Sequence, residues 1–165
     1  MMNEAYEELI AGQRVQRRIP TPEHETLVTR LHTLVARSLP LNSTLKLLGP
    51  RAELELDGLS VLRPDLAIVQ MRPMVDGSQR VQLYLVAEVL QAGDHHVDTV
   101  AKKQIWSEGM LPRLWIVDPR YFNVEVYGAG EHGFTLREIL ANHHSLTDPH
   151  LPGFCPTMPE LFIGN

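Results

Sequence analysis

The chain has 165 residues, of which 44% are hydrophobic and 21% charged, so bulk disorder is excluded and one domain of ordinary size, spanning residues 1–165, is expected. Its formal net charge of −5 is a poor match to a protein held on DNA mainly by phosphate neutralisation. The single cysteine, Cys155, excludes an intrachain disulfide and a zinc site built from thiolates alone.

The sequence carries no membrane or export signal. No run approaches the ~20 apolar residues that a membrane span needs. The first residues, MMNEAYEELIAGQR, lack the basic and then apolar pattern of a signal peptide. We therefore expect a cytoplasmic protein without a membrane partner.

The N-terminal third predicts a basic segment and then a helix. QRVQRR at 13–18 is the only basic cluster, and we interpret it as a solvated strand or turn. The helix, over 21–39, has Thr21 as its N-cap, Pro22 in its first turn and a stripe of apolar side chains at helical spacing. The stripe consists of Leu27, Leu31, Leu34 and Val35.

Strands dominate the rest of the chain. Residues 53–62 predict a hairpin that turns at Asp57-Gly58. A strand begins after Pro64, a mobile polar loop follows at 70–80, and the segments 81–90 and 113–118 are apolar enough to be buried on both faces. Residues 94–108 predict a crossover helix with an apolar face of Val97, Val100, Ala101 and Ile105. Residues 122–128 predict a further strand, and residues 127–133 predict a turn.

This order of elements predicts an α/β (α+β) fold with a central mixed β-sheet flanked by helices. The strand–helix–strand unit over 83–118 is expected to be parallel and right-handed. The C-terminal segment LPGFCPTMPELF is expected to pack through Phe154, Leu161 and Phe162.

Two carboxylates in apolar strands suggest chemistry. Glu88 lies inside LYLVAEVL, where an ionised group must be paired, protonated or bound to a metal. Asp65 opens the strand after Pro64, and if the two strands are neighbours their carboxylates converge. Hard oxygen ligands of this kind select Mg²⁺, Mn²⁺ or Ca²⁺ rather than zinc.

Lys102 is open to two interpretations. Asp98 and Lys102 are four residues apart on the expected helix, which is the spacing of a surface ion pair. Alternatively, Lys102 points back toward Glu88, where its ammonium would orient a water molecule or offset negative charge.

The order and spacing of these residues resemble the Uma-two family of endonucleases, within the PD-(D/E)XK restriction-endonuclease-like superfamily. The segments that carry the resemblance are Pro64-Asp65, Glu88-Val89-Leu90, Asp98 and Lys102, Trp106, and Trp115-Ile116-Val117-Asp118-Pro119. YEELIAG, TPEHE and the C-terminal segment extend it over nearly the whole chain. The resemblance implies a restriction-endonuclease-like core.

The resemblance also implies roles for particular residues. Asp65, Glu88 and the carbonyl of Val89 would hold Mg²⁺ or Mn²⁺. Lys102 would stand in for the lysine that the superfamily often places two residues after the glutamate, where this chain has Leu90. Glu8, His24, Gln91 and Asp98 are further candidates for the same site.

The sequence differs from the family pattern at the residues that would contact a bound phosphate. The usual Ser-Pro-Ser-Thr and arginine-rich residues are replaced by QAGDHH, and the usual aspartate of the N-terminal segment is Ala11. The local acidity of Asp94 and Asp98 opposes nucleic-acid binding unless a metal or Lys102 and Lys103 compensate.

Three functions follow as alternatives. The first is a Mg²⁺-dependent nuclease acting on nucleic acid, with DNA as the expected substrate and a homodimer expected because cutting both strands of a duplex needs two sites. The second is a catalytically inactive member of the same fold that serves as a binding or assembly module. The third is hydrolysis of a small phosphate ester in the same acidic pocket.

Overall fold

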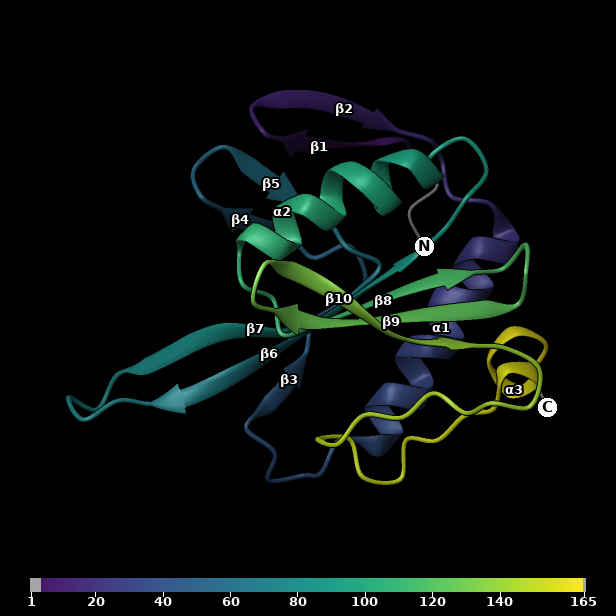
Figure 1. Ribbon diagram of the computed structural model, residues 1–165. Coiled ribbons are helices and arrows are strands. Elements are labelled where there is room, and N and C mark those ends of the chain that lie inside the picture. The colour runs from purple at the N-terminus through teal and green to yellow at the C-terminus, as the bar shows by residue number, and fades with distance from the viewer. Residues whose placement is uncertain (1–3, 165) are drawn as a thin grey trace.

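The computed structural model describes residues 4–164, and its centre is a six-stranded mixed sheet (Figure 1). The strand order is β10-β9-β8-β7-β6-β3. The strands are β3 (Leu45–Leu47), β6 (Leu66–Pro73), β7 (Gln79–Val89), β8 (Arg113–Asp118), β9 (Asn123–Gly130) and β10 (Gly133–Leu140). β7 and β8 pair in parallel and their other pairings are antiparallel, so the predicted mixed sheet is confirmed.

β7 and β8 form the buried middle of this sheet. From Tyr84 to Val89, and from Leu114 to Asp118, every residue is buried. Continuous apolar runs suit strands that are covered on both faces, whereas one-sided strands alternate with polar residues. The parallel pairing and the burial of 114–118 and 84–90 are confirmed, whereas Val81 and Gln82, at the start of the segment predicted to be buried, are exposed.

Helices and a second sheet cover the two faces. α1 (Pro22–Ser38), α3 (Met158–Phe162) and the C-terminal segment pack on one face (Figure 1). The π-helical segment η1 (Val97–Lys102), α2 (Lys103–Glu108) and the second sheet lie on the other. That sheet has the order β2-β1-β5-β4, with β1 (Tyr6–Ile10), β2 (Gln13–Arg17), β4 (Leu54–Leu56) and β5 (Ser60–Leu62).

α1 follows the local signals of its sequence. The Thr21 side chain accepts a hydrogen bond from the backbone N–H of His24, as an N-cap does. Leu27, Leu31 and Val35 are buried against the central sheet. No helix in the described part of the chain is long and apolar enough to cross a membrane.

The segment 70–80 is not the predicted loop. β6 and β7 remain paired out to Pro73 and Gln79, so the turn is confined to residues 74–78. The polar side chains that suggested a loop are the exposed side chains of a long hairpin, which extends beyond the rest of the sheet (Figure 1). β3 and β10 were likewise not predicted, and the turn expected over 127–133 contains the ends of β9 and β10.

The crossover helix exists, but its predicted buried face is partly wrong. Val100 is exposed, whereas Asp98 and Lys102 are buried. The helix begins with the π-helical turn η1, which changes the spacing at which side chains share a face. A rule based on regular α-helical periodicity therefore assigns the wrong residues to the interior.

Candidate functional site

Asp65 and Glu88 are brought together by strand pairing. Leu66 of β6 pairs with Ala87 of β7, so Asp65 lies next to Glu88 at the edge of these two strands. Both side chains are buried. Asp65 Oδ2 accepts a hydrogen bond from the backbone N–H of Val89 at 2.8 Å, which ties the carboxylate to the end of β7.

Lys102 reaches the same place from the crossover helix. Its Nζ lies 2.7 Å from Glu88 Oε1, 3.0 Å from Glu8 Oε1 and 3.6 Å from Asp98 Oδ1. Lys102 is only 1% exposed, so the surface ion pair with Asp98 is wrong and the orientation toward Glu88 is confirmed. Trp106, one helical turn further on, donates its indole N–H to Glu88 Oε1 at 3.1 Å.

Arg17 completes this group of buried charges, which we call the charged cluster: Glu8, Arg17, Glu88, Asp98 and Lys102. The Arg17 guanidinium donates to Glu8 Oε2 at 2.5 Å and to both oxygens of Asp98 at 2.9 Å. Its Nε lies 3.4 Å from Asp94. The acidic residues near the crossover helix are thus neutralised by an arginine from the β1–β2 hairpin.

Sequence reasoning missed Arg17 because it read 13–18 as a solvated basic segment. Arg14 of that segment is exposed, but Arg17 is buried on the same side of β2 as the half-buried Val15. Tyr6 and Arg17 are cross-strand partners, as are Glu8 and Val15. The alternation of Val15 and Arg17 was the one local signal that could have placed Arg17 inward.

His24 lies between the backbone of Val89 and the carboxylate of Asp65. Its Nε2 is 3.0 Å from the Val89 carbonyl oxygen and 3.3 Å from Asp65 Oδ2. Because both neighbours are acceptors, Nε2 carries a proton and donates. Burial alone would lower the pKa of His24, but its hydrogen bond to Asp65 and that residue's charge outweigh burial and raise it.

Arg51 also approaches Asp65, and its Nη2 lies 3.4 Å from His24 Nδ1. Its guanidinium pairs with Glu25, and its Nε lies 3.6 Å from Asp65 Oδ1. Asp65 Oδ1 is buried and receives no hydrogen bond from the described residues. Arg51 sits in a loop at a positive φ of 55°, and no pattern in the sequence pointed to it.

Gln91 is not part of the charged cluster. Its Oε1 accepts from the backbone N–H of Thr21 at 2.8 Å, and its Nε2 donates to the carbonyl of Ile19 at 3.3 Å. Gln91 therefore fixes the linker between β2 and α1 to the end of β7. The structure gathers Glu8, Glu88 and Asp98 around Lys102, brings His24 onto Asp65, and places Gln91 outside both groups.

Burial and neighbouring charges have opposite effects on the pKa values of the ionisable groups in the charged cluster. Burial raises the pKa of Glu88 to about 8, against the opposing effect of Lys102. Burial opposes the charged form of Lys102 too, but Glu88, Glu8 and Asp98 outweigh it and hold its pKa above the ordinary value. The ammonium thus keeps its proton at neutral pH, while Glu88 is the carboxyl of the pair that can take one up.

The donor atoms suit a hard divalent cation in type and charge. Asp65, Glu88 and the Val89 carbonyl offer oxygen, and Asp65 Oδ1 is a buried acceptor without a hydrogen bond. The charged cluster holds three carboxylates against two cations. These donors are not preassembled, however: residues 4–164 contain no group of three His, Cys, Asp or Glu side chains in a metal-binding arrangement. His24 engages the Val89 carbonyl and Lys102 engages Glu88 instead.

Comparisons with known proteins identify the family of the chain and agree with its fold. The family model described as "Uma2: Putative restriction endonuclease" matches residues 3–159. Among solved structures, the chain is similar to a "putative nuclease belonging to DUF820" from Anabaena variabilis ATCC 29413, with a TM-score of 0.72. The two are 13% identical, and the similarity covers 96% of this chain and 90% of that one. At that identity the likeness shows the fold, which is the restriction-endonuclease-like one expected from the sequence. No curated protein matches the chain.

Proposed function

The chain belongs to the Uma2 restriction endonuclease family, and from this premise we propose that it is a divalent-metal-dependent nuclease that hydrolyses phosphodiester bonds in DNA. One observation carries the proposal: Asp65 is bonded to the end of β7, beside a Glu88 whose carboxylate lies 2.7 Å from a buried lysine. A surface ion pair would not require a buried contact between Lys102 and Glu88 beside Asp65. Acid–base and metal chemistry requires contacts of about 3 Å.

Asp65, Glu88 and the Val89 carbonyl would hold the cation, as restriction-endonuclease-like families generally use divalent metals. When bound, the ion polarises the phosphate and lowers the pKa of a coordinated water. The Val89 carbonyl also accepts a hydrogen bond from His24 Nε2, so the histidine and the cation would share this oxygen, which has two lone pairs.

Lys102 contributes as a cation rather than as a base. Its pKa is held above the ordinary value by three carboxylates, so it keeps its proton throughout the neutral range. A fixed ammonium next to Glu88 stabilises negative charge that builds on a phosphate during hydrolysis. The pKa of Glu88 is about 8 in the absence of a bound ion, so binding of a divalent cation to this carboxylate would release a proton near neutral pH.

A second function is favoured by one observation. Glu8, Glu88, Asp98 and Lys102 are each at most 1% exposed, and their charges are already satisfied by one another and by Arg17. A closed cluster of this kind suits a non-catalytic binding or assembly module of the same fold. For the nuclease, the β1–β2 hairpin that carries Glu8 and Arg17 must move to admit a phosphate.

Cleavage of supercoiled plasmid DNA in Mn²⁺ separates the two functions. We expect wild-type protein to nick the plasmid and Glu88→Gln or Lys102→Met to lose about 10²-fold or more in rate. Glu88→Gln removes a carboxylate that would hold the cation, and Lys102→Met removes the ammonium that offsets developing negative charge. Glu55→Gln is the matched control, since Glu55 is an exposed carboxylate on β4. Circular dichroism verifies that each variant is folded.

Cleavage by Glu88→Gln at the wild-type rate would contradict the nuclease proposal. A folded wild-type protein that cleaves no DNA or RNA and binds no Mn²⁺ would favour the assembly module. The homodimer expected from duplex cleavage stays a prediction.

A further inference from the structure

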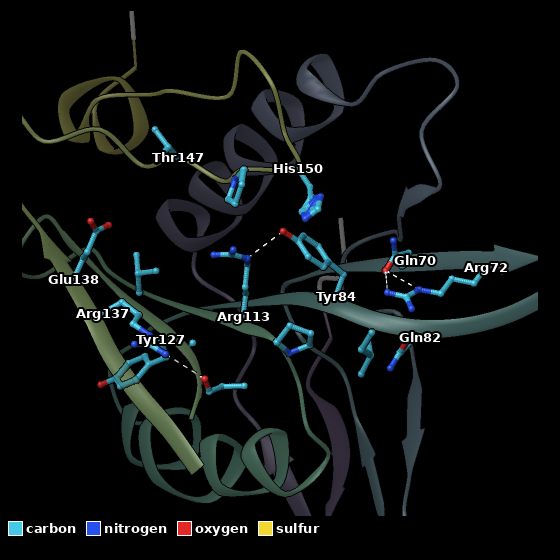
Figure 2. A pocket seen from close by; sticks show the side chains of 16 residues that line it. Gln70, Arg72, Gln82, Tyr84, Arg113, Tyr127, Arg137, Glu138, Thr147 and His150 are labelled. Carbon is cyan, nitrogen blue, oxygen red and sulfur yellow. Dashed lines mark hydrogen bonds between the residues drawn. The ribbon is translucent and has the colours of Figure 1, made fainter. Parts of the chain in front are cut away.

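An open pocket of about 750 Å³ lies away from the charged cluster, where β8 begins (Figure 2). Three arginines from three strands line it: Arg72 of β6, Arg113 of β8 and Arg137 of β10. Tyr84, also in its wall, precedes Glu88 by four residues on β7, a separation of roughly 13 Å at ~3.3 Å per residue. The pocket is therefore a separate feature of the same sheet, and we call it the arginine pocket.

Two of these guanidinium groups contact only neutral acceptors. Arg72 donates through Nε and Nη2 to Gln70 Oε1, at 3.2 and 3.0 Å. Arg137 donates to the carbonyl of Ala129 at 3.3 Å. Neither forms an ion pair within residues 4–164, and both are exposed. Their positive charge is thus available to a ligand, which contrasts with the fully paired Arg17 of the charged cluster.

The third arginine is held in place. Arg113 Nε donates to the Tyr84 hydroxyl at 3.0 Å and lies 3.1 Å from the buried Asp148 Oδ2. The Tyr84 hydroxyl donates to Asp148 Oδ1 at 2.7 Å, and the Tyr84 ring meets His150 edge to face at 5.2 Å. This network fixes the pocket's inner wall, and the Arg113 side chain stays 32% exposed.

The remaining lining combines apolar residues with polar side chains and includes one exposed acidic side chain. Gln82, Thr147 and His150 present an amide, a hydroxyl and an imidazole. Glu138 also lines the pocket and is its one exposed carboxylate, set against the three arginines. Arginine forks match the geometry of phosphate oxygens, and amide and hydroxyl donors supplement them. The balance of charge and donors selects an anion with several oxygens.

We propose that the arginine pocket binds the phosphodiester backbone of nucleic acid, at a second contact distinct from the charged cluster. The inference rests on the proposed function, since it takes the substrate of that site as its ligand. The β6–β7 hairpin extends beyond the sheet and carries Arg72, so a bound duplex would follow the hairpin past the pocket (Figure 1). A chain of net charge −5 thereby holds DNA through a local basic surface.

The test is fluorescence anisotropy with a labelled DNA duplex of about 20 base pairs in EDTA, over roughly 50–200 mM salt. We expect the double variant Arg72→Gln/Arg137→Gln to bind at least about tenfold more weakly. Its slope of log K against log salt should be smaller by about 2, because each lost phosphate contact removes about 0.9. Arg37→Gln, which changes an exposed arginine on α1, is the matched control and should behave as wild type.

Equal affinity and equal salt slope for wild type and the double variant would overturn the proposal. So would loss of inorganic phosphate binding in the double variant with duplex binding unchanged, since the pocket would then be a small-anion site only. Glu55→Gln, at an exposed position of β4, is expected to bind the duplex as wild type does in EDTA. If no plasmid is cleaved but the salt slope still depends on the two arginines, the proposed activity fails and the arginine pocket stands.

Discussion

Arg17 shows how strongly a single residue is required when its partners are buried. It is 5% exposed and faces Glu8 and Asp98, neither of which has access to water. Removing one member of a buried ion pair leaves an uncompensated charge, at a cost of about 3–5 kcal/mol. We therefore expect Arg17→Met to lower the free energy of unfolding by that amount in urea denaturation.

Arg14→Met is the control for Arg17→Met. Arg14 is on the same strand and pairs with Glu7, but its side chain is 79% exposed. Such a surface pair contributes little, so its loss should change the free energy of unfolding by less than about 1 kcal/mol. Similar losses for the two variants would mean that the charged cluster does not hold the β1–β2 hairpin in place.

At the scale of the element, α1 is stabilised at its N-terminus by Thr21, whose side chain accepts from the N–H of His24. Replacing an N-cap threonine by alanine costs about 1 kcal/mol, because a backbone donor of the first turn loses its partner. We expect that loss for Thr21→Ala in thermal and urea denaturation. Thr33→Ala, at an exposed position inside α1, should be neutral or slightly stabilising, since alanine is the better helix former. Destabilisation of both variants by the same amount would rule out the cap as the cause.

The elements that could be predicted are those whose signals are local. α1 has a cap and an apolar stripe, and β7 and β8 are long apolar runs. β10 and the outer half of the β6–β7 hairpin could not be recognised, because their side chains are mostly exposed and only their backbone pairing defines them. The π-helical segment η1 could not be predicted either, because it does not follow α-helical periodicity. For this reason Val100 was wrongly predicted to be buried.

At the scale of the whole molecule, the candidate site is assembled from segments far apart in the chain. Asp65, Glu88 and Lys102 were expected together because the family resemblance supplied their long-range order. Arg17 and Arg51 were not expected, since they reach the site from the β1–β2 hairpin and from a loop. Arg17 contacts Asp98, 81 positions away, and Arg51 contacts Asp65, 14 positions away. The residues next to each arginine carry no pattern that predicts these pairs.

The assembly of this site should make the stability of the whole protein depend on pH through Glu88. Its pKa is about 8 in the folded protein, chiefly because of burial, and 4.5 is its ordinary value. The folded state therefore binds this proton more tightly than the unfolded chain does. The contribution of Glu88 to stability is present below about pH 4.5 and is lost as the pH rises toward 8.

Glu88→Gln keeps the shape of the side chain and removes its titration. We expect the free energy of unfolding of this variant, minus that of wild type, to increase between about pH 5 and pH 8. The slope is at most about 1.4 kcal/mol per pH unit, the value for one proton. Urea denaturation in EDTA at several pH values measures the difference, in which the other titrating groups largely cancel. A flat or falling difference for Glu88→Gln would show that Glu88 is ionised in the folded protein across this range.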